Sequence, residues 1–217
     1  MRTGRIALAS ALLCSAIASP AHAVAPGTTD TFEDGSTEGW ATGDASPNPP
    51  VNVASGGPAG AGDHYLLLTA TGAAGPGGKL VAWPGADFHG DYLAAGITAL
   101  TMDLNNLGPT ALSLRLAIDG PPGSFAISGA AVVLPSGSGW TSVAFPMLPS
   151  DFEGDAAQAL SGVSQLRLFH GTSALFPGGA IVAQLGVDNV TAVPEPGMAW
   201  MLAGGLAALA LQRRRTA

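Results

Sequence analysis

The feature that most restricts the fold is the clear alternation of large apolar side chains with small or polar ones in Leu-Ser-Leu-Arg-Leu-Ala-Ile-Asp at residues 112–119. Leucine and isoleucine occupy the even positions, while Ser113, Arg115 and Asp119 occupy odd ones. Successive side chains of a β-strand point to opposite faces. The segment therefore predicts a strand with one face in a hydrophobic core and the other face outside it.

Other apolar runs along the chain are equally short and are bounded by Gly, Pro, Asn or Asp, which is typical of strands separated by turns. Only 155–160 indicates a helix, and no strand–helix–strand rhythm is present. We therefore predict an all-β fold, a β-sandwich of the jelly-roll kind, over residues 24–192. The further strands are expected at 28–32, 51–54, 65–70, 79–83, 97–105, 125–127, 131–134, 140–145, 163–169 and 183–193.

The N-terminal residues 1–23 have the layout of a secretory signal peptide. Arg2 and Arg5 precede an apolar run at 6–18, and Ala-His-Ala ends the segment at Ala23. This order of charge, apolar run and small residues predicts export through the Sec machinery and cleavage by signal peptidase after Ala23. Cys14, the only cysteine, leaves with the peptide, so the exported protein would have no disulfide and no thiol nucleophile.

The C-terminal tail carries an uncharged apolar stretch at 198–211, followed by Arg213, Arg214 and Arg215. As a helix this stretch would be roughly 21 Å long, against a hydrocarbon core of roughly 30 Å. The arginines would remain in the cytoplasm and the preceding residues outside. The stretch predicts a short transmembrane helix with the body of the protein on the outer side.

The motif Val-Pro-Glu-Pro, a short apolar span and a terminal Arg cluster follow one another over residues 193–217. This segment resembles a PEP-CTERM sorting signal. The resemblance implies recognition of Pro194, Glu195 and Pro196 by exosortase, a membrane-embedded cysteine transpeptidase, with 199–211 as the membrane span. The three arginines are then the membrane stop. An ordinary tail anchor is the alternative.

The same resemblance implies a location. The family occurs in Gram-negative bacteria that make exopolysaccharide. The chain would be held transiently in the inner membrane, processed, and delivered to the cell surface or the extracellular matrix.

The body is far more acidic than the whole chain, whose net charge is −7. Residues 24–192 contain 14 Asp and Glu against Lys79, Arg115 and Arg167, a balance of 3 − 14 = −11. Such a body repels nucleic acid and anionic lipid, so neither is an expected partner. It could bind cations.

The beginning and end of the body carry a second resemblance. Phe-Glu-Asp-Gly at 32–35 is followed by Gly-Trp at 39–40, then Gly-Trp at 139–140, and finally Val-Asp-Asn-Val at 187–190. This order is similar to galactose-binding-like jelly rolls, which include many carbohydrate-binding modules. The resemblance implies adjacent first and last strands, and a structural Ca²⁺ near Glu33 and Asp188, whose oxygens suit a hard cation. Alternatively, the two acids only stabilise local turns.

Aromatic residues offer flat apolar faces on which sugars stack. We expect Trp40 and Trp140 in the core, and Trp83, which precedes Pro-Gly, at the surface. The neighbouring segment 86–92 concentrates Asp87, His89 and Tyr92, which could line a ligand cleft. The alternative is a polar loop whose Phe88 and Tyr92 are anchored in the core.

No catalytic constellation is recognisable. The histidines at 64, 89 and 170 are dispersed, and no G-x-S-x-G motif is present. The leading hypothesis is an exported, non-catalytic β-sandwich protein of the cell surface or exopolysaccharide matrix, which acts there as a structural or carbohydrate-binding component. The alternatives are a protein-binding adhesin and a glycosidase, which would need two carboxyl groups roughly 5–9.5 Å apart in a cleft.

Overall fold

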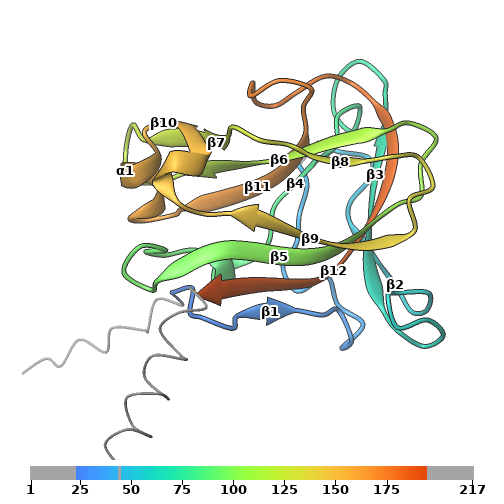
Figure 1. The fold of residues 1–217 in the computed structure, drawn as a ribbon. Helices are drawn as coiled ribbons and strands as arrows, with labels where there is room; N and C mark the ends of the chain where they lie inside the picture. The colour runs from blue at the N-terminus through green and yellow to red at the C-terminus, as the bar shows by residue number, and fades with distance from the viewer. Residues whose placement is uncertain (1–22, 44, 195–217) are drawn as a thin grey trace, which may run out of the picture.

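The computed structural model describes residues 23–43 and 45–194, which form two antiparallel β-sheets packed face to face (Figure 1). The first sheet has the order β2-β3-β12-β5-β9, and β1 also pairs with β12. Its strands are β1 (Thr29–Asp30), β2 (Val51–Val53), β3 (Tyr65–Thr71), β5 (Ile97–Asn106), β9 (Trp140–Pro146) and β12 (Val182–Pro194).

The second sheet has the order β10-β7-β6-β11-β4, and β8 also pairs with β6. Its strands are β4 (Val81–Ala82), β6 (Leu112–Asp119), β7 (Phe125–Ser128), β8 (Val132–Leu134), β10 (Phe152–Gly154) and β11 (Gln165–His170). The described residues contain one α-helix, α1 (Ala156–Leu160), and two short 3-10 helices, Ala86–Phe88 and Pro149–Asp151.

The predicted all-β sandwich is therefore confirmed, and a strand lies in every segment where one was expected. The strand β10 was not expected, because Phe152–Gly154 is an acidic stretch without an apolar alternation. It forms because its backbone pairs with β7. The helix at α1 agrees with the short helical segment expected at 155–160.

The core lies between the sheets and is built mostly from alternate residues of the long strands. Leu112, Leu114, Leu116 and Ile118 of β6 are all buried there, as the alternation of this segment predicts. From the first sheet, β3, β5 and β12 contribute their inward-facing leucines and valines. Burial of this apolar surface is the main force that holds the two sheets together.

The outer face of the second sheet is not open to solvent along its whole length, because a strap formed by residues 171–180 lies on it (Figure 1). Within the strap, the Phe176 ring packs edge-on against the rings of Phe169 and Phe125, with ring centroids 5.3 Å and 6.0 Å apart, respectively. The guanidinium of Arg115 donates from Nε to the carbonyl oxygen of Gly171 at 3.0 Å. Thus Arg115, although on the outward face of β6, is buried.

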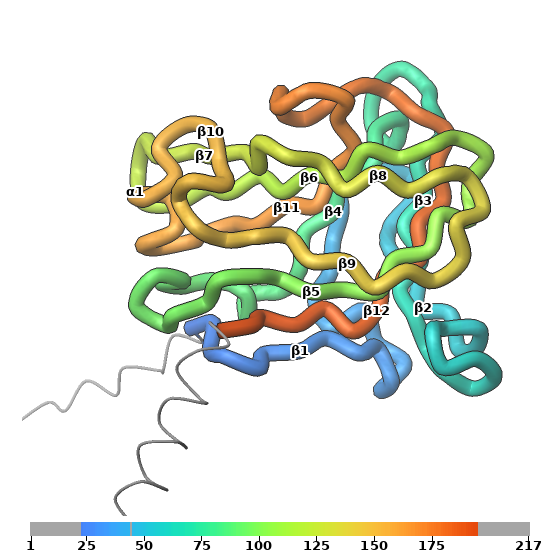
Figure 2. Tube along the Cα trace, in the orientation of Figure 1, coloured from blue at the N-terminus to red at the C-terminus, as the bar shows by residue number. Residues whose placement is uncertain are grey.

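The two ends of the described chain lie side by side (Figure 2). Thr29 is opposite Thr191 and Asp30 is opposite Val190 in the pairing of β1 with β12. The adjacency of first and last strands is therefore confirmed. Within residues 23–43 and 45–194, no helix has the length and apolar character needed to span a bilayer. The expected signal peptide before Ala23, the membrane helix at 199–211, Glu195, Pro196 and the Arg cluster lie outside the described residues.

Candidate functional site

The outward face of the first sheet carries a row of residues that crosses five strands. Strand register places Val51, Leu67, Gly186, Asn105 and Trp140 opposite one another in turn, from β2 to β9. Adjacent strands lie about 4.8 Å apart, so the row is about 19 Å long. It is long enough to follow an extended ligand across the sheet.

Two aromatic side chains form the centre of this face. Tyr65 and Trp140, both half-buried, meet edge-to-face with ring centroids 5.3 Å apart. The indole Nε1 of Trp140 donates to the carbonyl oxygen of Gly56 at 2.8 Å, which fixes the orientation of the ring. We call Tyr65 and Trp140 the aromatic pair.

Gly186 makes room for the aromatic pair. A Cβ atom at this position would lie 2.9 Å from Cη2 of Trp140 and 3.4 Å from Cδ2 of Tyr65. The indole thus lies directly against the backbone of β12, and a side chain at 186 would push it away. Glycine within a strand often marks such a close approach.

Polar groups surround the aromatic pair. The side-chain amides of Asn105 and Gln184 face outward and make no hydrogen bond to another described residue. Asp103 accepts hydrogen bonds from Ser142 and, at 2.9 Å, from Nδ2 of Asn189. An apolar aromatic centre with free amide groups beside it provides both kinds of contact that a neutral sugar makes.

Asp188 is buried next to this face, in the row adjoining Trp140. Its side chain is 1% exposed, and Oδ1 accepts a hydrogen bond from the Asn189 amide at 2.7 Å. The other oxygen, Oδ2, has no hydrogen-bond partner among the described residues. Burial raises the pKa of Asp188 to about 7, and the nearby charges of Asp63, Glu33 and Asp103 act in the same direction.

The structure therefore brings Glu33 and Asp188 close enough to interact electrostatically. Glu33 is exposed, and its Oε1 accepts a hydrogen bond from the His64 amide at 3.0 Å. No group of three or more His, Cys, Asp or Glu side chains within 23–43 and 45–194 is arranged to hold a metal ion. A calcium ion here would need carbonyl oxygens and waters besides Asp188 and Glu33, because Ca²⁺ takes six to eight oxygens.

Asp188 also faces Asp103 across β12 and β5. Directly opposite residues in antiparallel strands have Cβ atoms about 4.5–5.5 Å apart, so these two acids are neighbours, and a glycosidase needs two neighbouring acids in a cleft. However, Asp188 is almost fully buried, so its carboxyl group is closed to a substrate in this conformation.

The residues expected near 83–92 separate into two groups. Asp87 is exposed, and Trp83 and His89 are half-buried. Tyr92 is fully buried and donates from its hydroxyl to the Phe88 carbonyl oxygen at 3.0 Å, so its ring has no face for a ligand. Burial raises its pKa well above the ordinary value. The alternative, a loop anchored in the core by Phe88 and Tyr92, describes this segment.

Trp40 is buried, as expected, and its Nε1 donates to Oδ2 of Asp30 at 2.7 Å. Trp140 differs from the expectation. It is half-buried on the outward face of the first sheet and does not belong to the core between the sheets. It occupies the first position of β9, and the alternation along this strand puts Phe145 in the core and Trp140 outside.

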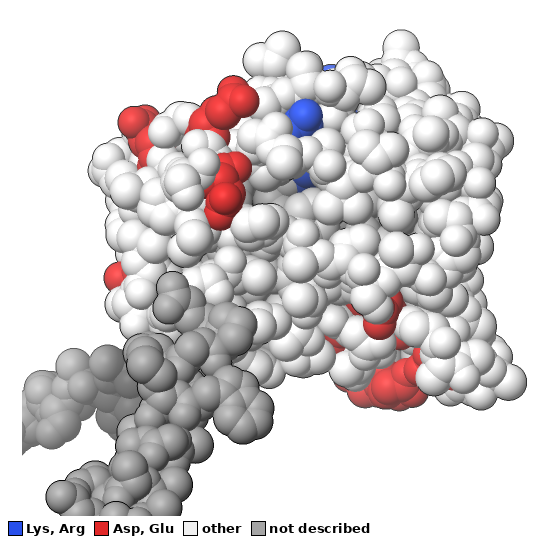
Figure 3. All heavy atoms as spheres, in the orientation of Figure 1, with Lys and Arg blue, Asp and Glu red and all other residues white. Residues whose placement is uncertain are grey.

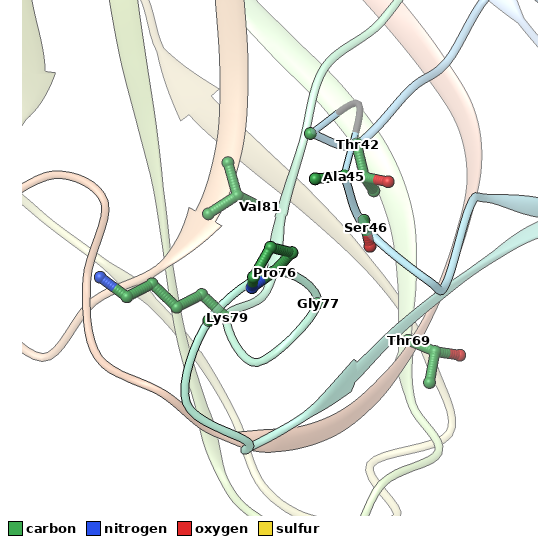
Figure 4. A pocket seen from close by; sticks show the side chains of 10 residues that line it. Thr42, Ala45, Ser46, Thr69, Pro76, Gly77, Lys79 and Val81 are labelled. Carbon is green, nitrogen blue, oxygen red and sulfur yellow. The ribbon is translucent and has the colours of Figure 1, made fainter.

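A separate pocket of about 350 Å³ lies near β3 and β4 (Figure 4). Thr42, Ser46 and Thr69 supply hydroxyl groups to it, and the Lys79 side chain extends away from them (Figure 4). It contains no aromatic ring among its lining residues. The aromatic pair on the first sheet is therefore the better candidate for a sugar-stacking surface.

Comparison with known proteins identifies the fold. No protein-family model and no curated protein sequence matches the chain. Among solved structures, an exo-β-agarase matches with a TM-score of 0.57 at 13% identity, covering 76% of this chain and 25% of that one. The present chain thus spans about a quarter of the length of that agarase.

Two structures of the family 11 carbohydrate-binding module from Clostridium thermocellum also match, each with a TM-score of 0.51. One, in complex with a β-1,3-1,4-mixed-linked tetrasaccharide, is 11% identical, and the match covers 78% of this chain and 97% of the module. The other belongs to the cellulosomal cellulase Lic26A-Cel5E and is 9% identical, with 79% and 96% covered. At these identities the likeness concerns the fold. The expected similarity to jelly-roll carbohydrate-binding modules is confirmed at that level.

The sequence interpretation missed Tyr65 and Gly186. Tyr65 begins a strand and looks like any other strand aromatic, and Gly186 is one of 31 glycines. Their significance arises from strand register, which brings Tyr65 of β3, Gly186 of β12 and Trp140 of β9 together from positions 46 to 121 residues apart in the sequence.

Proposed function

We propose that this chain is an exported, non-catalytic protein that binds a polysaccharide on the outward face of its first sheet. The aromatic pair of Tyr65 and Trp140 is the observation that carries this proposal. One sugar ring stacks on the indole, and the amides of Asn105 and Gln184 hydrogen bond to its hydroxyl groups. The fold shared with carbohydrate-binding modules supports the same function.

The sorting part of the proposal rests on the sequence. Sec export, cleavage after Ala23, and exosortase processing at Pro194, Glu195 and Pro196 would release the acidic body into the exopolysaccharide outside a Gram-negative cell. Intact-mass analysis of the protein from its host, with and without exosortase, tests this. A mass that lacks about 20 C-terminal residues supports processing, and an intact tail in the inner membrane contradicts it.

We further propose that Ca²⁺ binds at Asp188 with Glu33 as the second carboxylate. The unpartnered, buried Oδ2 of Asp188 supports this, because a bound cation would compensate a charge that is otherwise costly to bury. The ion would be structural: it would neutralise Asp188 beneath the binding face and tie the Glu33 loop to β12.

Affinity electrophoresis and a glycan array on the purified body test the sugar-binding function. Trp140→Ala should abolish retardation by the polysaccharide that retards the wild type. Trp83→Ala is the matched variant, since Trp83 is also half-buried but lies in the 83–92 region. If only Trp83→Ala loses binding, the sugar-binding site lies in the 83–92 region and not at the aromatic pair.

The same samples distinguish the alternatives. A chain that binds no glycan at millimolar concentration contradicts the polysaccharide function and favours a protein-binding adhesin. Release of new reducing ends from a bound polysaccharide would favour a glycosidase.

A further inference from the structure

The first sheet ends in one long strand, β9, whose outer edge is open. Within the described residues, β9 has seven residues and pairs only with β5, whereas the other terminal strands of the two sheets, β2, β10 and β4, have three, three and two residues. A pocket of about 440 Å³ lies between residues 144–146 of β9 and residues 128–132, so the latter segment does not cover this edge. Four of the seven residues are exposed: Thr141, Ser142, Ala144 and Pro146.

The backbone of β9 directs alternate hydrogen-bonding groups away from the sheet. In an antiparallel pair, successive residues alternately exchange hydrogen bonds with the neighbouring strand and point away from it. The amide of Met147 donates to the carbonyl oxygen of Thr98 at 2.8 Å, and the register from there back to Trp140 runs without a shift. Every second residue counted back from Met147 therefore bonds to β5, while Ser142 and Ala144 direct their N–H and C=O groups outward. Such a row of unpaired groups is a template for another strand.

The same edge is free of charge. No charged residue and no histidine occurs from Gly120 to Ser150, the longest uncharged segment of the acidic body. Figure 3 shows a white area over β9, between the two groups of acidic side chains. Edge strands are commonly protected by lysine and other charges, by proline or by bulges, but β9 has only Pro146 at its last position. Two copies of a body that repels itself elsewhere can therefore meet at this edge.

We propose that β9 pairs antiparallel with β9 of a second copy of this chain, about a two-fold axis at Val143. This register overlaps all seven residues and places Ser142 opposite the partner's Ala144, so the outward-directed backbone groups of both strands meet. An acidic or basic peptide would find no charge to pair with here, whereas a second uncharged edge matches the first. Asp103, which is opposite Ser142 on β5, lies at least three strand spacings or about 14 Å from its counterpart, beyond a screening length of about 8 Å.

Pairing through β9 places both aromatic pairs on one surface. The two-fold axis is perpendicular to the joined sheet, so the outward faces of the two copies lie on the same side. Trp140 and the partner's Trp140 are then six residues apart along the strands, about 20 Å. One polysaccharide chain can contact both aromatic pairs, and the avidity exceeds the affinity of a single site. This consequence rests on the proposed sugar-binding function, whereas the pairing of the strands does not.

Sedimentation equilibrium of the purified body, residues 24–194, tests the pairing without any sugar. Both sheets and the core lie within these residues. A pair of seven-residue strands is smaller than the interface of a permanent dimer, so the association should be reversible. We expect the mass to rise from one copy at low micromolar concentration to two copies near millimolar concentration, and to stop there because pairing uses up the edge. A body that stays monomeric throughout, or that grows beyond two copies, would overturn the proposal.

Variants at one position connect the association to β9. Ala144→Pro removes one outward N–H from each copy without breaking the ladder to β5, and should weaken dimerisation by about tenfold. Ala144→Lys, which sets like charges against each other in the dimer, provides the same test should the proline variant fail to fold. Ala180→Lys is the matched control, because it adds the same charge at an exposed position of the strap on the second sheet.

The control should dimerise as the wild type does. Wild-type dimerisation in Ala144→Lys, or its loss in Ala180→Lys, would place the contact elsewhere and overturn the proposal. Affinity electrophoresis then measures the avidity: the control should be retarded by a long polysaccharide more strongly than Ala144→Lys, while both bind a short oligosaccharide equally. A dimer that binds no glycan would contradict the proposed function and leave the strand pairing supported.

Discussion

At the scale of single residues, the outward face of the first sheet depends on two positions of β12, one that must lack a side chain and one that carries a buried carboxyl group. Gly186 must have no side chain, because the indole of Trp140 lies on its backbone. Asp188, two residues later on β12, must place a carboxyl group in a buried position beside other acids. Asn189 follows at a positive φ of 50°, where the pairing of β12 with β5 shifts register. This bulge locally re-aims the side chains of the strand.

Gly186→Ala should displace Trp140 and thereby damage both stability and binding. The added methyl would lie 2.9 Å from the indole, so we expect a loss of about 1–3 kcal/mol in the free energy of unfolding, typical of overpacking. Polysaccharide affinity should fall with it, measured by affinity electrophoresis. Gly179→Ala is the control, because a Cβ there meets nothing within 4 Å. Unchanged binding in Gly186→Ala would show that the indole is not the platform.

Asp188→Asn should raise the stability of the calcium-free protein at pH 8, on the order of 1 kcal/mol, because it removes a charge that burial disfavours. Calcium at about 5 mM, a concentration suited to weak extracellular sites, should raise the melting temperature of the wild type and not of Asp188→Asn. Scanning calorimetry with EDTA and with added calcium measures both effects. If added calcium leaves the melting temperature of the wild type unchanged, the proposed calcium site is contradicted.

At the scale of elements, the two sheets use their outward faces differently. The first sheet leaves Trp140, Asn105 and Gln184 accessible, whereas the second sheet is covered by the strap of residues 171–180. The strap is attached by Phe176 and by the hydrogen bond from Arg115 to Gly171. Arg167 contributes as well, since its guanidinium lies 5.1 Å from the centre of the Phe176 ring and pairs with Asp119 at 2.6 Å.

Phe176→Ala should loosen the strap and destabilise the protein by about 1–2 kcal/mol, since half-buried aromatic contacts and a cation–π interaction are lost. Leu175→Ala changes the neighbouring residue, whose side chain is 71% exposed, and should alter the free energy of unfolding by no more than about 0.5 kcal/mol. Urea denaturation of both variants provides the measurement. Polysaccharide binding should survive in Phe176→Ala, because the strap and the aromatic pair lie on different sheets. Equal stabilities of the two variants would show that Phe176 does not hold the strap.

At the scale of the whole molecule, the body is strongly acidic, and its acids are unevenly distributed. Two groups of acidic side chains are visible on the face shown in Figure 3, one of them over β10 and α1. Few basic side chains appear on the same face. A surface of this charge repels polyanions, so the proposed polysaccharide ligand should be neutral, or anionic only when cations bridge the two.

Stability should fall as pH rises from about 4 to 7. Asp30 and Asp188 both have a folded-state pKa of about 7, above the ordinary value of 3.8, so the native state holds protons that the unfolded state has released. Asp34 acts in the opposite direction, because hydrogen bonds with Ser36 lower its pKa, but it is fully exposed. Urea denaturation of the body in EDTA should give a higher midpoint at pH 5 than at pH 8. A midpoint that rises with pH would contradict the burial of these two acids.

The sequence by itself determined the class of fold. The alternation over 112–119 has the period of a β-strand, and the short apolar runs between turn residues also favour strands over buried helices. It also determined the acidic character of the body, and it predicts the export and sorting segments through local patterns of charge and hydrophobicity.

Only the tertiary structure decided which residues meet. Trp40 and Trp140 look alike in the sequence, yet one is buried against Asp30 and the other lies outside on Gly186. The difference depends on strand register, since a shift of one residue moves a side chain to the opposite face of a sheet. The pairing of Tyr65, Gly186 and Trp140, and the approach of Glu33 to Asp188, join distant segments, and such contacts carry no local signal along the chain.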